Sequence, residues 1–383
     1  MNYQNVFSQI EALADRYLNV WKECCELESP SIDKAAVDRC GQYFIDFAKE
    51  HGWKVEVLEQ SVSGNAVCIT MNPEVNEKPL AVSGHIDTVH PVGLFGDTPV
   101  RIEGDTIYGP GVCDCKGGIV AALLAMDALE KCGYKKRPVQ LLLQSDEEVG
   151  SKLSKKATIN WMCEQAKDAV AFLNLEGSTT GKACLQRKGI ITYRLTITGK
   201  EAHASRCATE GASAVLDAAH KIIALEKLKD AEGLTCNVGT VEGGTAANTV
   251  PGKCELLANI RFATQDQLEW VKGYVQEIAN TVHVPGCTCE LKQESFRVAM
   301  EYHERNVQLL DQLNDSFAEC GMDRLVFSKG TGGSDAADVT VYGIPCIDNL
   351  GVEGKGIHSI HECADIPSLE RSAKWLVAAA LGL

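Results

Sequence analysis

Apolar positions near the start of the chain recur every three or four residues, with charged residues between them. This period predicts amphipathic helices over residues 3–26 and 32–50. Runs of Val, Ile and Leu then predict strands that alternate with helices. The strands are 53–59, 65–71, 79–86, 139–144 and 169–175, and the helices are 116–133 and 152–165. Such alternation indicates an α/β sheet with crossovers, whose ligands bind at the carboxyl ends of strands.

The pattern changes at Gly189, where the predicted order becomes βαββαβ, the ferredoxin-like unit. Its elements are strand 190–198, helix 212–225, strands 234–241 and 254–262, helix 267–279 and strand 287–291. From about residue 298 the chain returns to helix, strand and helix, ending in an amphipathic segment over 367–381. We therefore expect one α/β domain, 1–188 and 298–383, interrupted by an inserted ferredoxin-like domain over 189–297.

The length of the chain and its net charge limit the classes of protein to which it can belong. A chain of 383 residues is long enough for two domains, and its 52 acidic against 37 basic residues give a net charge of -15. This charge disfavours nucleic acid and anionic membrane as partners. No apolar run approaches the roughly 18 residues that span a bilayer, and the first residues do not read as a secretory signal. We expect a cytoplasmic protein.

The 17 cysteines are an odd number in a long chain without a secretory pattern, so we interpret them mostly as reduced, buried thiols. Two Cys-x-Cys pairs, Cys113/Cys115 and Cys287/Cys289, leave a thiolate zinc site as the less favoured alternative.

Five polar clusters fall where the strands should end. They contain His85 with Asp87, Asp114 in a glycine-rich loop before a helix, the acidic run 146–148, Glu176, and His358. Any one of these taken alone is more simply a solvated or capping residue. Together they would concentrate negative charge at one sheet edge, which bound cations would neutralise. Two imidazoles among carboxylates suit zinc better than calcium or magnesium.

Five motifs carry a family resemblance. They are His-x-Asp-Thr-Val at 85–89, Gly-x-Gly-x-x-Asp-x-Lys-Gly-Gly at 109–118, Asp-Glu-Glu-x-Gly-Ser at 146–151, the strand-end Glu176, and Gly-x-His-Ser at 356–359. In this order they resemble the dinuclear zinc hydrolases that include glutamate carboxypeptidase (carboxypeptidase G), acetylornithine deacetylase, succinyl-diaminopimelate desuccinylase and tripeptidase T. Segments 100–111 and 331–336 look closest to the glutamate carboxypeptidase branch.

The resemblance implies a catalytic α/β domain that binds two zinc ions per chain, with cobalt or manganese as possible substitutes. Asp114 would bridge the ions. The further ligands would be His85 and Glu176 for one ion, and Glu148 and His358 for the other. His361, three residues after His358, is the less favoured ligand because it lies outside the Gly-x-His-Ser motif.

Two catalytic roles beside the ions also follow from the resemblance. Glu147 would be the general base that acts on a metal-bridging water, and Asp87 would hold His85 from behind. Relatives often have a cis peptide bond after the bridging aspartate, so we expect one at Asp114–Cys115.

The inserted domain is similar to the family's lid and dimerisation domain. His203, in Gly199-Lys200-Glu201-Ala202-His203, matches a histidine that reaches the partner subunit's active site and stabilises the oxyanion. A loop histidine that caps nearby backbone is the alternative. Asn248, Arg261 and Arg297 match positions that bind the substrate's carboxylate. We therefore expect a homodimer formed through the lid. Five other histidines fit no motif and are expected to be structural: His51, His90, His220, His283 and His303.

Together these features predict a metallopeptidase of the carboxypeptidase-like exopeptidase type, which hydrolyses an amide bond next to a free carboxylate. The alternative is an amidohydrolase that deacylates small N-acyl amino acids, like acetylornithine deacetylase, with the same zinc chemistry. A non-catalytic binding protein on the same fold is disfavoured, because Glu147 and a full ligand set are present.

Overall fold

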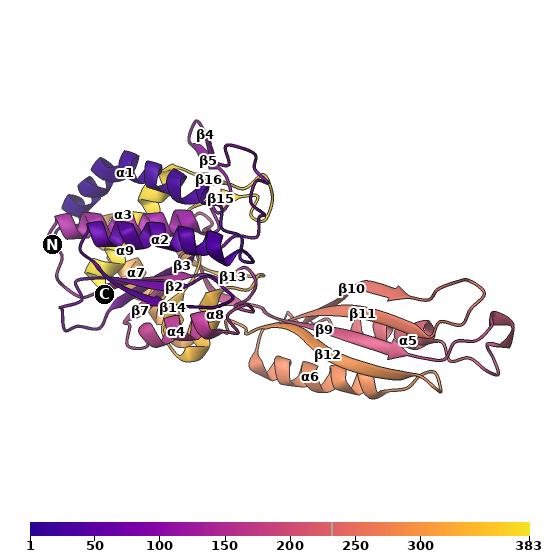
Figure 1. The fold of residues 1–383 in the computed structure, drawn as a ribbon. Helices are drawn as coiled ribbons and strands as arrows, with labels where there is room; N and C mark the ends of the chain where they lie inside the picture. The colour runs from indigo at the N-terminus through magenta and orange to yellow at the C-terminus, as the bar shows by residue number, and fades with distance from the viewer. Residues whose placement is uncertain (231–232) are drawn as a thin grey trace. The chain divides into compact units, whose positions relative to one another are not determined.

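The computed structural model describes residues 1–230 and 233–383, which form two compact units. The first unit comprises 1–186, 302–330 and 334–383, and the second comprises 187–301 and 331–333. The second unit therefore interrupts the first along the chain (Figure 1).

A mixed six-stranded sheet is the centre of the first unit, with strand order β1-β2-β6-β3-β7-β14. The strands are β1 Lys54–Leu58, β2 Ala66–Met71, β3 Leu80–His85, β6 Val139–Gln144, β7 Ala171–Asn174 and β14 Cys346–Ile347. Strands β6, β3, β7 and β14 run parallel to one another, whereas β1 and β2 pair antiparallel. Because β2, β3 and β7 are buried on both faces, apolar residues follow one another along them and do not alternate with polar ones.

Helices cover both faces of this sheet (Figure 1). They are α1 Tyr3–Glu26, α2 Lys34–Glu50, α3 Lys116–Lys131, α4 Ala157–Gln165, α7 Glu304–Cys320, α8 Asp335–Tyr342 and α9 Pro367–Gly382. Helices α2, α3 and α9 pack on one face, with α1 against α3, while α4 and α8 lie on the other. Helix α3 is buried along nearly its whole length, because it lies between the sheet and α1.

One helix begins later than its pattern predicted. We expected a helix from residue 152, but α4 begins at Ala157, and Lys155 and Lys156 adopt left-handed backbone conformations. The buried carboxylate of Asp146 accepts hydrogen bonds from the backbone N–H of Ser154 and the hydroxyl of Thr158. These bonds stabilise a turn over 151–156 in place of the first helical turn.

Two small sheets were not predicted from the sequence. One has the order β15-β16-β5-β4, and the other pairs β13 with β8. Their strands are β4 Arg101–Glu103, β5 Thr106–Tyr108, β8 Lys182–Arg187, β13 Val326–Gly330, β15 Gly354–Lys355 and β16 Cys363–Asp365. The strands of the β15-β16-β5-β4 sheet have two or three residues each, too few for an alternating pattern to reveal them.

The second unit is a four-stranded antiparallel sheet with order β10-β11-β9-β12. Its elements are β9 Gly189–Thr198, α5 Ala214–Leu225, β10 Thr235–Gly243, β11 Lys253–Phe262, α6 Gln265–Asn280 and β12 Thr288–Arg297. Buried and half-buried positions alternate along β9 and β11, so one face packs on α5 and α6 and the other stays polar. The predicted α/β fold with an inserted ferredoxin-like lid is confirmed.

All 17 cysteines are free thiols, and 14 of them are buried. This agrees with the interpretation of reduced core cysteines. Across the described residues, none of the helices combines the length and the apolar character that a membrane span requires.

Candidate metal centre

The register of three parallel strands brings one imidazole and three carboxylates of the predicted site to one edge of the sheet. His85 ends β3 and pairs with Gln144, the last residue of β6, so Glu147 and Glu148 follow just beyond that edge. Ser83 pairs with Asn174 at the end of β7, which places Glu176, two residues on, level with His85. The side chains converge because the strands end together.

The small β15-β16-β5-β4 sheet positions the remaining two ligands. Strand β5 leads into the loop that carries Asp114, and the β15–β16 connection carries His358. Because β16 pairs directly with β5, the two loops leave the same sheet side by side. His358 has a φ of 61°, a left-handed conformation that is uncommon outside glycine and often occurs at functional sites. The peptide bond Asp114–Cys115 is cis, as expected.

Two triads of metal-ligating atoms share the carboxylate of Asp114. On one side, His85 Nε2 lies 2.9 Å from Asp114 Oδ1 and 3.9 Å from Glu176 Oε1. On the other side, His358 Nε2 lies 3.2 Å from Asp114 Oδ2 and 3.0 Å from Glu148 Oε2. In each triad the potential ligand atoms all lie within 4.8 Å of one another. The structure thus brings together all five residues predicted as metal ligands.

The tautomer of His85 suits a metal ligand. Its Nδ1 lies 2.9 Å from the backbone carbonyl of Asp87, an acceptor only, so Nδ1 carries a proton and donates it. In the neutral ring Nε2 then has the free lone pair that a metal ligand needs. The Asp87 carboxylate is farther from Nδ1, at 3.5 Å.

The pKa values at the site reflect crowded carboxylates around two imidazoles. Burial would raise the pKa of Asp114, but hydrogen bonds with His358 and His85 outweigh burial and lower it. Hydrogen bonds with Asp114 and Glu148 raise the pKa of His358 to about 10. Burial raises the pKa of Glu148 to about 7 and that of Glu176 well above its usual value. Without a bound cation, protons and positively charged imidazoles have to balance these carboxylates.

Asp87 organises the segment that carries the other acids. Its buried carboxylate accepts backbone N–H bonds from Glu147 at 3.1 Å and Glu148 at 3.2 Å, and a hydroxyl bond from Ser31 at 2.6 Å. Glu147 is itself buried, and its charge contributes to the raised pKa values of Glu148 and Glu176. No sequence signal pointed to Ser31, which lies in a loop 56 residues before Asp87.

The donor set fits two divalent cations of the zinc type. Each triad offers one imidazole and two carboxylates, counting the shared Asp114, and structural thiolates are absent from both. Nitrogen and oxygen donors in groups of three leave a coordination position open, as in catalytic zinc sites. A shared carboxylate between two such triads is the arrangement of a dinuclear centre.

The residues predicted in the lid lie in the second unit. The backbone N–H of Ala204 donates to the carbonyl of Asn248 at 2.9 Å, so the segments of His203 and Asn248 are neighbours. His203 Nδ1 accepts the N–H of Ser205 at 3.3 Å, which leaves the proton of the neutral, exposed ring on Nε2.

Arg261 and Arg297 occupy equivalent positions on β11 and β12, because both pair with Ile190 of β9. Residues directly opposite one another in a sheet point to the same face, so both guanidinium groups belong to the polar face. Arg261 also lies 3.5 Å from the carbonyl of Thr331, in the short segment 331–333 that belongs to this unit.

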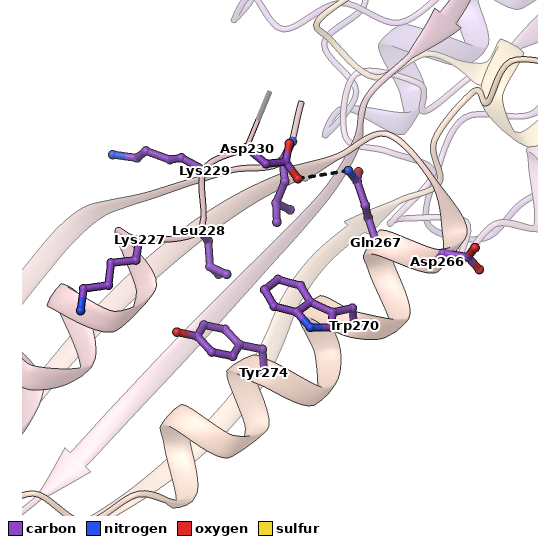
Figure 2. A pocket seen from close by; sticks show the side chains of 9 residues that line it. Lys227, Leu228, Lys229, Asp230, Asp266, Gln267, Trp270 and Tyr274 are labelled. Carbon is purple, nitrogen blue, oxygen red and sulfur yellow. Dashed lines mark hydrogen bonds between the residues drawn. The ribbon is translucent and has the colours of Figure 1, made fainter. Parts of the chain in front are cut away.

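A pocket of about 470 Å³ on the lid has different chemistry (Figure 2). It lies between α6 and the segment after α5, and Trp270 and Tyr274 stack there with ring centroids 5.1 Å apart. Gln267 donates to Asp230 across it at 3.4 Å. None of the described residues that line it is a predicted site residue. The candidate chemistry therefore belongs to the strand ends of the first unit.

Comparisons with known proteins identify the family of this chain. Residues 81–382 match the model of the peptidase family M20/M25/M40. Carboxypeptidase G2 of Pseudomonas sp. (strain RS-16) is 30% identical over 299 residues, 77% of this chain and 71% of that protein. Succinyl-diaminopimelate desuccinylase of Wolbachia pipientis wMel is 25% identical over 353 residues, 86% of this chain and 84% of that protein.

Two solved structures share the fold. Aminopeptidase PepT from Bacillus cereus ATCC 10987 superimposes with a TM-score of 0.80 at 21% identity, over 96% of this chain and 97% of that one. The M20 family metallo-carboxypeptidase Sso-CP2 from Sulfolobus solfataricus gives a TM-score of 0.75 at 18% identity, over 96% and 98%.

Proposed function

Because the chain belongs to the peptidase family M20/M25/M40 and is a hydrolase, we propose that it is a zinc-dependent exopeptidase of the carboxypeptidase type. Its substrate would be a small peptide, cleaved at an amide bond next to a free carboxylate. The single observation that carries this proposal is the pair of triads that share Asp114. The similarity to carboxypeptidase G2 supports the choice of a carboxypeptidase.

We assign His85 and Glu176 to one zinc ion, Glu148 and His358 to the other, and Asp114 to both. When bound, the two ions supply Lewis acidity that polarises the scissile carbonyl and lowers the pKa of a water molecule. Glu147, beside the ligands, accepts the proton of the attacking water and delivers it to the leaving amine. Asp87 keeps Glu147 in reach through the backbone bond to it.

The lid would bind and orient the substrate. The guanidinium groups of Arg261 and Arg297 suit a substrate carboxylate, and Asn248 offers both a donor and an acceptor. The exposed Nε2–H of His203 is a suitable donor to the oxyanion that develops at the scissile carbonyl.

We further propose a cytoplasmic homodimer in which His203 serves the partner's site. Among the described strands, β10 pairs only with β11 and is an edge of the lid sheet, apart from a single bridge between Thr235 and Lys229. Apolar side chains are exposed on the neighbouring helix α5 and on β10: Val215, Leu216, Ile223 and Val241. An unpaired edge beside exposed apolar residues favours pairing with a second copy.

The second candidate function is deacylation of small N-acyl amino acids, which the similarity to succinyl-diaminopimelate desuccinylase favours. Both candidates use the same metal centre. They differ in the acyl group of the amide bond that is cleaved, which is a peptide residue for the exopeptidase and a small acyl group for the deacylase. Hydrolysis of a mixed library of dipeptides and N-acyl amino acids, with zinc added, separates them. Turnover of dipeptides supports the exopeptidase, turnover of only acylated amino acids supports the deacylase, and inactivity of the zinc-loaded enzyme contradicts both.

A further inference from the structure

Glu362 lies four residues after His358 and makes an unusual set of hydrogen bonds beneath the metal centre. Its side chain is 2% exposed. Oε1 accepts the backbone N–H groups of Cys113 at 3.0 Å and Asp114 at 3.1 Å. Oε2 accepts the N–H of Gly111 at 3.2 Å and lies 3.3 Å from Nε2 of His90. One buried carboxylate therefore has four hydrogen-bond partners.

These partners belong to the segments that supply metal ligands. Asp114 itself donates to Glu362, and the loop from Gly111 to Asp114 wraps around the carboxylate. His90 lies five residues after His85, on the segment that leaves β3. Glu362 belongs to the loop of His358, where its own N–H donates to the carbonyl of Ser359 at 3.1 Å. The carboxylate thus joins three of the ligand-bearing segments.

The loop of Asp114 needs such an acceptor. Helix α3 begins at Lys116, and Cys115 at its N-cap offers no side-chain bond to the free N–H groups. The backbone N–H groups of Cys113 and Asp114 precede that helix and are buried, so without Glu362 they would lack a partner. Several N–H donors converging on one carboxylate fix the loop in one conformation, and with it the direction of the Asp114 side chain.

We propose that Glu362 is a positioning residue of the metal centre, which aims the bridging carboxylate of Asp114 and holds its loop against the loop of His358. Glu362 does not ligate a metal and acts through the backbone that carries the ligands. This inference rests on the proposed dinuclear zinc centre. It adds to that centre a determinant of metal affinity outside the two triads.

Glu362→Gln tests the proposal with little change of volume. An amide has one acceptor oxygen, so in either orientation its NH2 group faces an N–H donor of the loop. Changes behind metal ligands typically weaken binding about 10- to 100-fold, and we expect a fall of this size for zinc. Zinc dissociation constants, measured by competition with a chromophoric chelator, report this without an activity assay.

Asp217→Asn is the matched control. Asp217 is also a buried carboxylate that accepts two backbone N–H groups, those of His283 and Val284, but it lies in the lid. Its replacement should lower the melting temperature of the metal-free chain while leaving zinc affinity at the wild-type value. An equal loss of zinc affinity in both variants would show a general effect of instability and overturn the proposal.

Two further outcomes are decisive. Wild-type zinc affinity in folded Glu362→Gln overturns the role of Glu362 and leaves the proposed function intact. Failure of the wild-type chain to bind zinc removes the proposed centre, and the positioning role with it. If Glu362→Gln does not fold, Glu362→Asp withdraws the carboxylate by one methylene, and the same loss of zinc affinity is expected from it.

Discussion

The carboxylate of Asp87 accepts the backbone N–H of Glu147 at 3.1 Å, so the acid nearest to His85 in sequence fixes the backbone of the proposed general base. The same carboxylate accepts the N–H of Glu148. In Asp87→Asn the amide NH2 group would face one of these N–H donors and displace the pair. We expect kcat/KM to fall about 10- to 100-fold with the fold unchanged by circular dichroism. An unchanged kcat/KM would mean that these two bonds do not position the catalytic acids.

Adjacent glutamates are assigned opposite roles, and conservative replacement separates them. Glu147→Gln should retain two zinc ions per chain while kcat falls about 10²- to 10⁴-fold, because a general base is lost. Glu148→Gln should lose the ion that it shares with His358. Metal content by atomic emission and steady-state kinetics measure both effects. If Glu147→Gln loses a metal and Glu148→Gln keeps both, the two roles are exchanged.

Two exposed histidines on one loop provide a matched pair. His358 Nε2 lies 3.0 Å from Glu148, whereas His361 is bound through its backbone N–H, which donates to Ser359 Oγ at 3.2 Å. His358→Ala should therefore weaken one zinc site and nearly abolish turnover. His361→Ala should bind two ions and turn over like the wild type. Equilibrium dialysis against zinc compares them, and the reverse result would move the ligand by three positions.

Complementation between two inactive variants tests the trans role of His203. His203→Ala and Glu147→Ala chains, nearly inactive alone, are co-expressed. In a mixed dimer the His203→Ala chain keeps its metal site and base and receives His203 from its partner. Random pairing makes about half of the dimers mixed, with one working site of two, so roughly a quarter of wild-type activity should return. No recovery in verified mixed dimers would contradict the trans assignment and leave the zinc chemistry untouched.

Thiol labelling should single out one cysteine. Cys207 is the exposed one, whereas burial raises the pKa of Cys163 and of Cys236 to about 12. Only a thiolate reacts readily, so these buried thiols are slow by both access and ionisation. At pH 8 the folded protein should show one fast-reacting thiol by Ellman's assay, and Cys207→Ser should remove it. Cys132 and Cys289 are half-buried and should react more slowly.

The sequence was most informative where its pattern was long. Parallel strands such as β3 and β6 are rich in Val and Leu, so the ends of these strands, and the acids that follow them, could be located from the sequence. The direction of the Asp114 side chain could not be predicted, because it depends on strands of two or three residues such as β15 and β16. Glu362 was missed for a related reason. It follows the recognised His358 by four residues, but an acid in a loop gives no sign that three backbone N–H groups will surround it.

Helix 152–165 shows a different limit. Its apolar period continues back to residue 152, yet Asp146 competes for the first turn through Ser154 and Thr158. A side chain outside the helix thus decides where the helix begins. The outcome could be foreseen only by knowing that Asp146 lies buried beside that turn.

The interrupted layout of the first unit bears on how the enzyme is made in the cell. His85, Asp114, Glu148 and Glu176 all precede residue 187, whereas His358 follows the whole inserted unit. A growing polypeptide therefore has one complete triad long before the ribosome has synthesised the last ligand of the other. On the proposed ligand assignment, a partly translated chain could capture a first ion, whereas a second ion would bind only after the lid and the segment to His358 have emerged. The proposed centre would then be completed in the order of translation, and the site of His358 would form last.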